Sequence, residues 1–230
     1  MDANYYIKRK GRLLRDFDGV IKRVLPLLEE RYGSEWTRSM LAEARQEYEA
    51  LIPRLPYVGG VQPLTQFVVA TGWFLAMYRV FQRQGRTVDE VARLAYDMTE
   101  HYLKVVPGFA RGLLGHMTFS PRYARKLQKG ARESQERRYP DGYVFAYVEG
   151  NGEEFDYGVD YLECATCKFL QREGAMELQP YLCALDHLHS KMMGWGLTRT
   201  KTLAEGYDRC DFRFKKGGPT RVASKVMDLS

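Results

Sequence analysis

The pattern of the chain changes at residues 139–142 (Tyr-Pro-Asp-Gly), and this change constrains the fold more than any other feature. Before it, apolar residues recur at helical spacing, as between Leu13 and Leu28, and Thr87 begins a capping-box pattern. After it, residues 143–148 have strand composition and residues 155–161 alternate apolar and polar side chains. Two short helical segments and two further strands follow. The order β-β-α-α-β-β after a helical half predicts an α+β fold with a small antiparallel sheet and two helices.

The same patterns give approximate bounds for each element. The expected helices cover residues 13–28, 34–52, 63–84, 87–105, a segment from Pro121, 164–173 and 180–193. The expected strands cover residues 143–148, 155–161, 197–202 and 211–215, and residues 107–115 are expected to be irregular. We therefore divide the chain into a helical N-terminal extension (1–60), an α+β domain (61–216; helices 61–138, sheet part 139–216) and a loose tail (217–230).

Charge and hydropathy exclude some classes of partner. The net charge is +6, and much of the basic excess lies in residues 122–138, where Glu133 and Glu136 interrupt it. Without a nucleic-acid motif, this pattern is typical of a solvated helix face, so we expect no nucleic-acid partner. The apolar segment 67–80 contains Thr71, which favours a buried helix, and we expect no membrane contact. A small-molecule substrate is the expected partner, and a homo-oligomer stays open.

The N-terminus and the cysteines indicate the compartment. Residues 1–16 are charged throughout and lack the apolar core of a signal peptide, which predicts a cytoplasmic protein. The four cysteines all lie in the last third of the chain: Cys164, Cys167, Cys183 and Cys210. Such clustering favours a catalytic thiol, a metal site or buried packing over disulfides.

A metal site is the first alternative for these thiols. The spacing of Cys164, Cys167 and Cys183 matches three positions of a four-cysteine zinc pattern, but Asp186 stands where the fourth cysteine would follow. We therefore expect no metal and no cofactor.

A catalytic thiol is the second alternative. On a helix over 180–193, Cys183 and Asp186 are three residues apart and share a face, and His187 lies four residues after Cys183. A base or a positive environment is what makes a thiol nucleophilic, so His187 could activate Cys183. Buried packing of Cys183 and a solvated Asp186 remain the competing interpretation.

Polar groups on the last two strands could bind a substrate. Arg199 and Arg213 could both point into one cleft, where paired guanidiniums suit a carboxylate. Thr200 and Thr202 add hydroxyls on one strand face, and Gly206 permits a tight turn. An ion pair between Asp211 and a neighbouring arginine on the sheet surface is the alternative.

Several short motifs carry a family resemblance, which covers residues 143–215 and extends weakly towards Pro63. They are Glu163-Cys164, Glu177-Leu178, Cys183-x2-Asp186, Leu197-Thr198-Arg199-Thr200-x-Thr202, Glu205-Gly206 and Cys210-Asp211-Phe212-Arg213-Phe214. This pattern resembles the L-2-amino-thiazoline-4-carboxylic acid hydrolase family. The resemblance implies a hydrolase-like domain that opens a cyclic amidine with water, acting on C–N bonds and giving an N-carbamoyl cysteine.

The resemblance also implies roles for the candidate residues. Cys183 would be the nucleophile, Asp186 the partner of the amidinium and His187 the proton carrier. Arg199 or Arg213 would hold the substrate carboxylate. The remaining candidates for substrate binding are Thr200, Thr202, Gly206, Cys164, Cys210 and Asp211, and either Cys164 or Cys210 could replace Cys183 as nucleophile.

Two functions without catalysis compete with the hydrolase. One is a sensor module in which the cysteines bind a metal or a small molecule. The other is a scaffold domain with the apolar segment 63–84 as its interface. Elemental analysis and mild alkylation of the thiols distinguish them from an enzyme with a reactive cysteine.

Overall fold

The first half of the chain folds into helices, as the periodicity predicts. The structure is a computed structural model that describes residues 4–226. Its first helices are η1 (Ile7–Arg9), α1 (Lys10–Tyr32), α2 (Ser34–Leu51), η2 (Ile52–Arg54), α3 (Leu64–Arg83), α4 (Val88–Val105), α5 (Gly108–Met117) and α6 (Pro121–Gln135). The expected capping box is confirmed at α4, where the Thr87 hydroxyl accepts a hydrogen bond from the Glu90 N–H and the Glu90 carboxylate accepts one from the Thr87 N–H.

Helix α5 corrects the expectation of an irregular segment over residues 107–115. The glycines of this segment read as helix breakers, but the structure uses Gly115 for close packing. A Cβ at Gly115 would lie 1.9 Å from the carbonyl oxygen of Met193, so α5 can pass this near to the end of α8 (Gln179–Met193) only with glycine there. Arg111 strengthens the corner by donating to the carbonyls of Leu103 and Val106, the last turn of α4.

The second half forms a five-stranded sheet with the order β1-β2-β4-β3-β5. Its strands are β1 (Val144–Glu149), β2 (Tyr157–Glu163), β3 (Leu197–Arg199), β4 (Cys210–Phe214) and β5 (Arg221–Val222). The α+β class is confirmed, but the sheet is mixed, because β5 runs parallel to β3 while the other pairs are antiparallel. Strand β5 also lies inside the segment 217–230 that we expected to be a loose tail, whose last residues, 227–230, are outside the described part.

Strand β3 is shorter than the expected range 197–202. The backbone N–H groups of Thr200 and Lys201 donate to the carboxylate of Asp211 instead of a neighbouring strand. The chain then enters η4 (Leu203–Glu205), which Thr202 caps by accepting from the Glu205 N–H. The β3 strand therefore ends at Arg199, because the next two backbone N–H groups bond to a side chain instead of a neighbouring strand.

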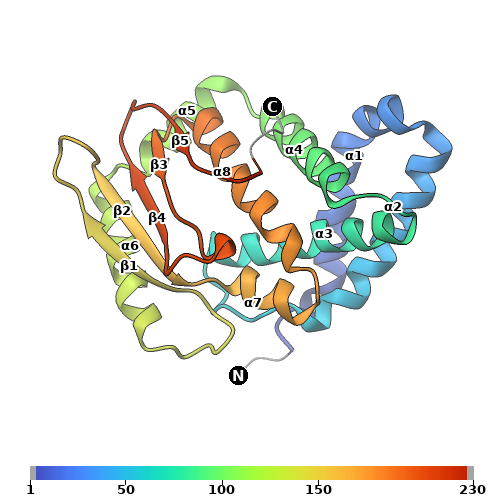
Figure 1. Ribbon diagram of the computed structural model, residues 1–230, viewed down its shortest axis with the longest axis horizontal. Helices are drawn as coiled ribbons and strands as arrows, with labels where there is room; N and C mark the ends of the chain where they lie inside the picture. The colour runs from blue at the N-terminus through green and yellow to red at the C-terminus, as the bar shows by residue number, and fades with distance from the viewer. Residues whose placement is uncertain (1–3, 227–230) are drawn as a thin grey trace.

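The sheet lies at one end of the molecule, and helices α1–α4 lie towards the other end (Figure 1). The largest core cluster joins buried residues of α1–α4 to those of α7 (Ala165–Arg172) and η3 (Met176–Leu178), so segments on both sides of residue 60 share it. Helix α3 is long and apolar enough to cross a membrane, but most of that segment is buried within the protein. Helix α6 covers the sheet through Ala131, Phe145 and Val159, and α8 lies between the sheet and α4 (Figure 1).

Candidate active site

The alternation of side chains along the strands decides which predicted residues can meet. Thr198 of β3 is paired with Arg213 of β4, so these two side chains lie on one face and Arg199 lies on the other. Cys210 and Arg213 are three residues apart on β4, so their side chains point to opposite faces of the sheet. Cys210 therefore lies on the same face as Arg199. The structure therefore brings Arg199 and Cys210 together and separates Arg213 from them, which corrects the expectation of two arginines in one cleft.

Arg199 is the centre of this face. Its side chain is 1% exposed and forms an ion pair with Asp186 of α8, while its Nη1 also donates to the Cys183 carbonyl at 2.9 Å. Nη2 lies 3.5 Å from the Ala223 carbonyl, and Nε has no hydrogen-bond partner within residues 4–226. The Asp186 side chain keeps 33% of its surface exposed. Burial raises the pKa of Asp186, and the charge of Arg199 opposes that rise.

One face of α8 presents further polar groups beside this ion pair. Gln179, Cys183 and Asp186 are spaced by four and three residues and so lie on one side of the helix. The Gln179 side chain is buried, and its Nε2 donates to the Cys183 Sγ at 3.3 Å. Its Oε1 accepts no hydrogen bond from any described residue. Sequence reasoning missed Gln179, although its spacing from Cys183 was visible.

Cys164 has the most acidic thiol of the cluster. It occupies the N-cap position of α7, directly after β2, and its Sγ lies 3.0 Å from the Thr166 Oγ1. A hydrogen bond from the Cys167 thiol, with further donors from Thr166 and two backbone N–H groups, outweighs burial and lowers the pKa of Cys164 to about 7. The pKa of Cys167 is raised, chiefly because its thiol proton is held in the hydrogen bond to Cys164.

The other two thiols are protonated at neutral pH. Burial raises the pKa of Cys183, and the nearby carboxylate of Asp186 adds to the effect. Burial also raises the pKa of Cys210 to about 12, although the Leu203 N–H donates to its Sγ at 3.2 Å. The negative charge of Cys164 acts on both thiols, so all three lie within electrostatic reach of one another.

The two histidines of α8 occupy different surroundings. His187 is half-buried, and burial followed by the charge of Lys191 lowers its pKa. His189 is the histidine whose charge acts on Asp186, three residues before it. Its Nδ1 lies 2.8 Å from the Leu185 carbonyl, which leaves Nε2 to exchange a proton if Nδ1 carries the hydrogen. Sequence reasoning selected His187 and missed His189.

The loop between β3 and β4 is held by four of the predicted substrate-binding residues: Thr200, Thr202, Gly206 and Asp211. The Asp211 carboxylate accepts from the Thr200 N–H at 2.8 Å, the Lys201 N–H at 2.6 Å and the Thr200 hydroxyl at 2.5 Å. Thr202 caps η4, and Gly206 ends it with a φ of 88°. The hydrogen bonds of these residues shape a loop; none of them reaches the thiols directly, except that the loop supplies the N–H donor to Cys210.

The side chain of Arg213 lies on the opposite face of the sheet from Arg199. Its Nη1 donates to Asp160 at 2.7 Å, and Arg209 approaches the same carboxylate at 3.4 Å. This ion pair is the sheet-surface alternative considered from the sequence, with Asp160 as the acid in place of Asp211.

The cysteine cluster was also considered as a metal site. Across residues 4–226, no three histidine, cysteine or acidic side chains are grouped so that they could hold a metal ion. The described geometry therefore gives the four-thiol metal interpretation no support.

The fold and the cluster define an α+β protein with thiols gathered beside a buried arginine–aspartate pair. Residues 66–214, more than half of the chain, match the family model of L-2-amino-thiazoline-4-carboxylic acid hydrolase, and the chain belongs to this family. No curated protein and no solved structure matches the chain. The matched segment contains Cys164, Cys183, Asp186 and Arg199, and it leaves α1 and α2 outside.

Proposed function

We propose that this protein is a hydrolase that opens a small cyclic amidine bearing a carboxylate, of the 2-amino-thiazoline-4-carboxylate type. The description of the family supports hydrolysis of such a compound. The observation that carries the proposal is the ion pair of Arg199 and Asp186, which stands among the thiols and keeps part of its carboxylate exposed.

The polar groups of the cluster match the two ends of such a substrate. An amidinium presents N–H groups, which the Asp186 carboxylate and the free Gln179 Oε1 would accept. The substrate carboxylate would take the unpartnered Nε–H of Arg199; because this atom is buried, the contact requires the residues around it to move when the substrate binds. Because a buried donor or acceptor without a partner is costly, a ligand that satisfies both groups gains binding energy.

Cys164 is the thiol best suited to attack the amidine carbon. Hydrogen bonds from the Cys167 thiol and from Thr166 lower its pKa, so this thiol forms the thiolate more readily than Cys183 or Cys210, whose pKa burial raises. Cys183, the nucleophile expected from the sequence, has a raised pKa and accepts a hydrogen bond from Gln179. We therefore assign the attack to Cys164, and we assign to Cys183 a role in holding Gln179.

The reaction balances in two steps. The Cys164 thiolate adds to the amidine carbon, the ring C–S bond breaks, and the released substrate thiolate takes a proton. Water then adds to the same carbon of the covalent intermediate, and the Cys164 thiolate leaves, giving an N-carbamoyl product. An N-carbamoyl product keeps both C–N bonds, so the bond that opens the ring is C–S rather than the C–N bond expected from the sequence. His189, near Asp186, would carry the protons.

The function is tested by incubating the purified full chain with 2-amino-thiazoline-4-carboxylate and with 2-aminothiazoline, which lacks the carboxylate. Mass spectrometry should show a product heavier than the first compound by one water. The compound without the carboxylate should react with a KM at least about tenfold higher, because it cannot engage Arg199. Absence of the hydrated product from both compounds, with the folded protein confirmed by circular dichroism, would refute the proposed substrate class.

A further inference from the structure

A second site lies at the other end of the molecule, where the N-terminal extension meets the family domain. A pocket of about 390 Å³ opens between α1, α3 and α4, and we call it the arginine pocket. Its walls come from residues 5–23 on one side and from Gln62, Thr65, Gln66, Val69, Trp73 and Tyr102 on the other. None of the thiols described above lines it.

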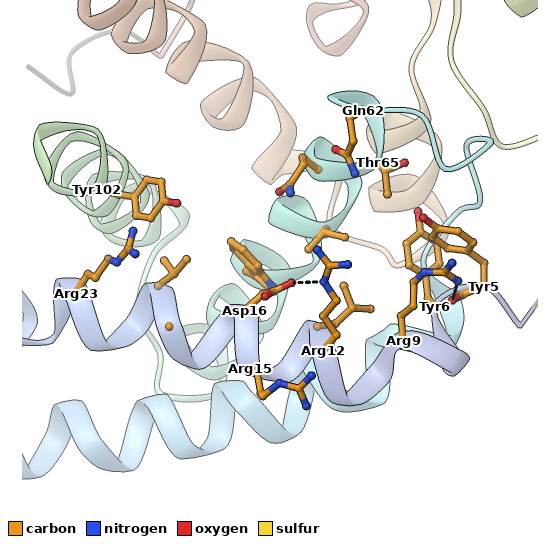
Figure 2. Close-up of a pocket in the computed structure, with 16 residues that line it drawn as sticks. Tyr5, Tyr6, Arg9, Arg12, Arg15, Asp16, Arg23, Gln62, Thr65 and Tyr102 are labelled. Carbon is orange, nitrogen blue, oxygen red and sulfur yellow. Dashed lines mark hydrogen bonds and ion pairs between the residues drawn. The ribbon is translucent and has the colours of Figure 1, made fainter. Parts of the chain in front are cut away.

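The charge of the arginine pocket is strongly positive. Four arginines line it, Arg9, Arg12, Arg15 and Arg23, against the single carboxylate of Asp16, although the Arg15 guanidinium points away from the cavity (Figure 2). The Arg12–Asp16 pair is loose, at 3.7 Å with both side chains more than half exposed. Arg15 and Arg23 have no carboxylate within ion-pair distance in the described part of the chain. Within residues 4–226, the pocket therefore holds more positive than negative charge, which favours an anionic ligand.

Aromatic rings hold two of these arginines in place. The Arg9 guanidinium lies 3.9 Å above the Tyr5 ring and donates to the Tyr5 carbonyl, and the Arg23 guanidinium lies 5.4 Å above the Tyr102 ring. Figure 2 shows these two pairs at opposite ends of the pocket, with Gln62 and Thr65 on the wall across from Arg12. A guanidinium stacked on a ring keeps donors at its edge, which suit phosphate oxygens.

The middle of the pocket can accept an uncharged ring or chain. Gly19 faces it from α1, and a Cβ added there would meet no atom within 4 Å. Val20, Val69 and Trp73 give this part an apolar lining. At a rise of about 1.5 Å per residue, Arg12 and Arg23 are separated along α1 by about 16 Å, so a ligand that meets both must be elongated.

We propose that the arginine pocket binds an elongated organic phosphate of the nucleotide type. The phosphate groups lie at the end with Arg9 and Arg12, where two guanidiniums are only three residues apart. The body of the ligand passes over Gly19, and its aromatic ring lies at the end with Arg23 and Tyr102. This site is independent of the proposed hydrolysis, because its charged wall belongs to η1 and α1, outside the matched segment 66–214.

Calorimetric titration of the full chain with ADP at low salt tests the proposal. We expect saturable binding with one ADP per chain, and at least about tenfold weaker binding of pyrophosphate and of adenosine, since each offers only one end of the ligand. R12Q should weaken ADP binding at least about tenfold. K22Q is the matched control, because Lys22 lies on the same helix and does not line the pocket. It should leave the affinity within about twofold.

A variant that fills the pocket without changing its charge completes the test. G19L places a side chain in the open space and should abolish ADP binding, while its melting temperature stays at or above that of the wild type, because leucine is a better helix former than glycine. Three results would overturn the proposal. They are the absence of saturable ADP binding, unchanged affinity in G19L, and an equal loss of affinity in K22Q and R12Q, which would indicate general charge attraction only.

Discussion

The buried guanidinium of Arg199 and the partly exposed carboxylate of Asp186 form an ion pair that joins β3 to α8. The same guanidinium donates to the Cys183 carbonyl, so one side chain connects the sheet to the helix at two points. Because Oδ2 of Asp186 accepts a hydrogen bond from the buried Arg199 guanidinium, the orientation of this partly exposed carboxylate is fixed. This is the arrangement that a site requires when it must recognise a planar cation.

Removal of Arg199 should destabilise the fold. R199M leaves Asp186 without its partner and the Cys183 carbonyl without a donor, and we expect a loss of about 2–4 kcal/mol of unfolding free energy. R45M is the control, because Arg45 pairs with Asp18 on the surface and its loss should cost less than about 1 kcal/mol. Urea denaturation measures both, and equal losses in the two variants would contradict a structural role for the buried pair.

Cys164 should react with iodoacetamide before the other thiols. Its pKa is lowered to about 7, so its thiolate fraction and its alkylation rate should rise as the pH increases through 7 and level off above pH 8. Cys183 and Cys210 should stay largely unmodified over this range, because burial raises their pKa. Peptide mass spectrometry identifies the alkylated thiol, and earlier modification of Cys183 would be inconsistent with our assignment.

The thiol of Cys167 should set the reactivity of Cys164. C167A removes the hydrogen bond that is the largest cause of the lowered pKa, so the midpoint of Cys164 alkylation should move to higher pH. C210A is the control, since no hydrogen bond connects Cys210 to Cys164 in the described residues. A midpoint that stays the same in C167A would show that the other donors at the start of α7 suffice.

Gln179 should contribute to substrate binding more than to stability. Its Oε1 is buried without a partner, so Q179L removes an unsatisfied acceptor and should change the unfolding free energy by less than about 1 kcal/mol. If Oε1 accepts an amidine N–H, the KM for ring opening should rise at least about tenfold. Gln171, which is exposed on α7, provides the control Q171L. An unchanged KM in Q179L would exclude this contact.

Asp211 should matter for the fold of its loop rather than for the substrate. D211A removes the acceptor of three hydrogen bonds from Thr200 and Lys201, and we expect a loss of about 1–3 kcal/mol of unfolding free energy. The KM of the folded fraction should stay within about threefold of the wild type. A large rise in KM without a loss of stability would restore Asp211 to the substrate site.

The elements that follow local rules could be predicted from the sequence. The capping box at Thr87 and the strand expected over residues 155–161 depend on neighbours in the chain. The structure confirms the capping box and forms β2 at Tyr157–Glu163, although residues 157–160 are all buried rather than alternating. Helix α5 could not be recognised, because Gly115 reads as a breaker until its contact with Met193 is known. Strand β5 has only two residues, and it pairs with a strand more than twenty residues earlier.

The relative positions of the candidate site residues could be predicted where they lie on one helix, but not where they depend on the pairing of strands in the sheet. Cys183 and Asp186 share a face of α8 as expected. The positions of Arg199 and Arg213 on opposite faces depend on strand register, which the sequence leaves open. The low pKa of Cys164 depends on donors gathered at the start of α7, and a count of thiols cannot show which one receives them.

The most direct test compares the kcat/KM of ring opening in C164S and C183S, with both variants checked for native circular dichroism. We predict that C164S loses activity by about a thousandfold or more, because the attacking thiolate is gone, and that C183S stays within about tenfold of the wild type. Full activity in C164S, or loss of activity confined to C183S, would contradict the assignment of Cys164 as the nucleophile.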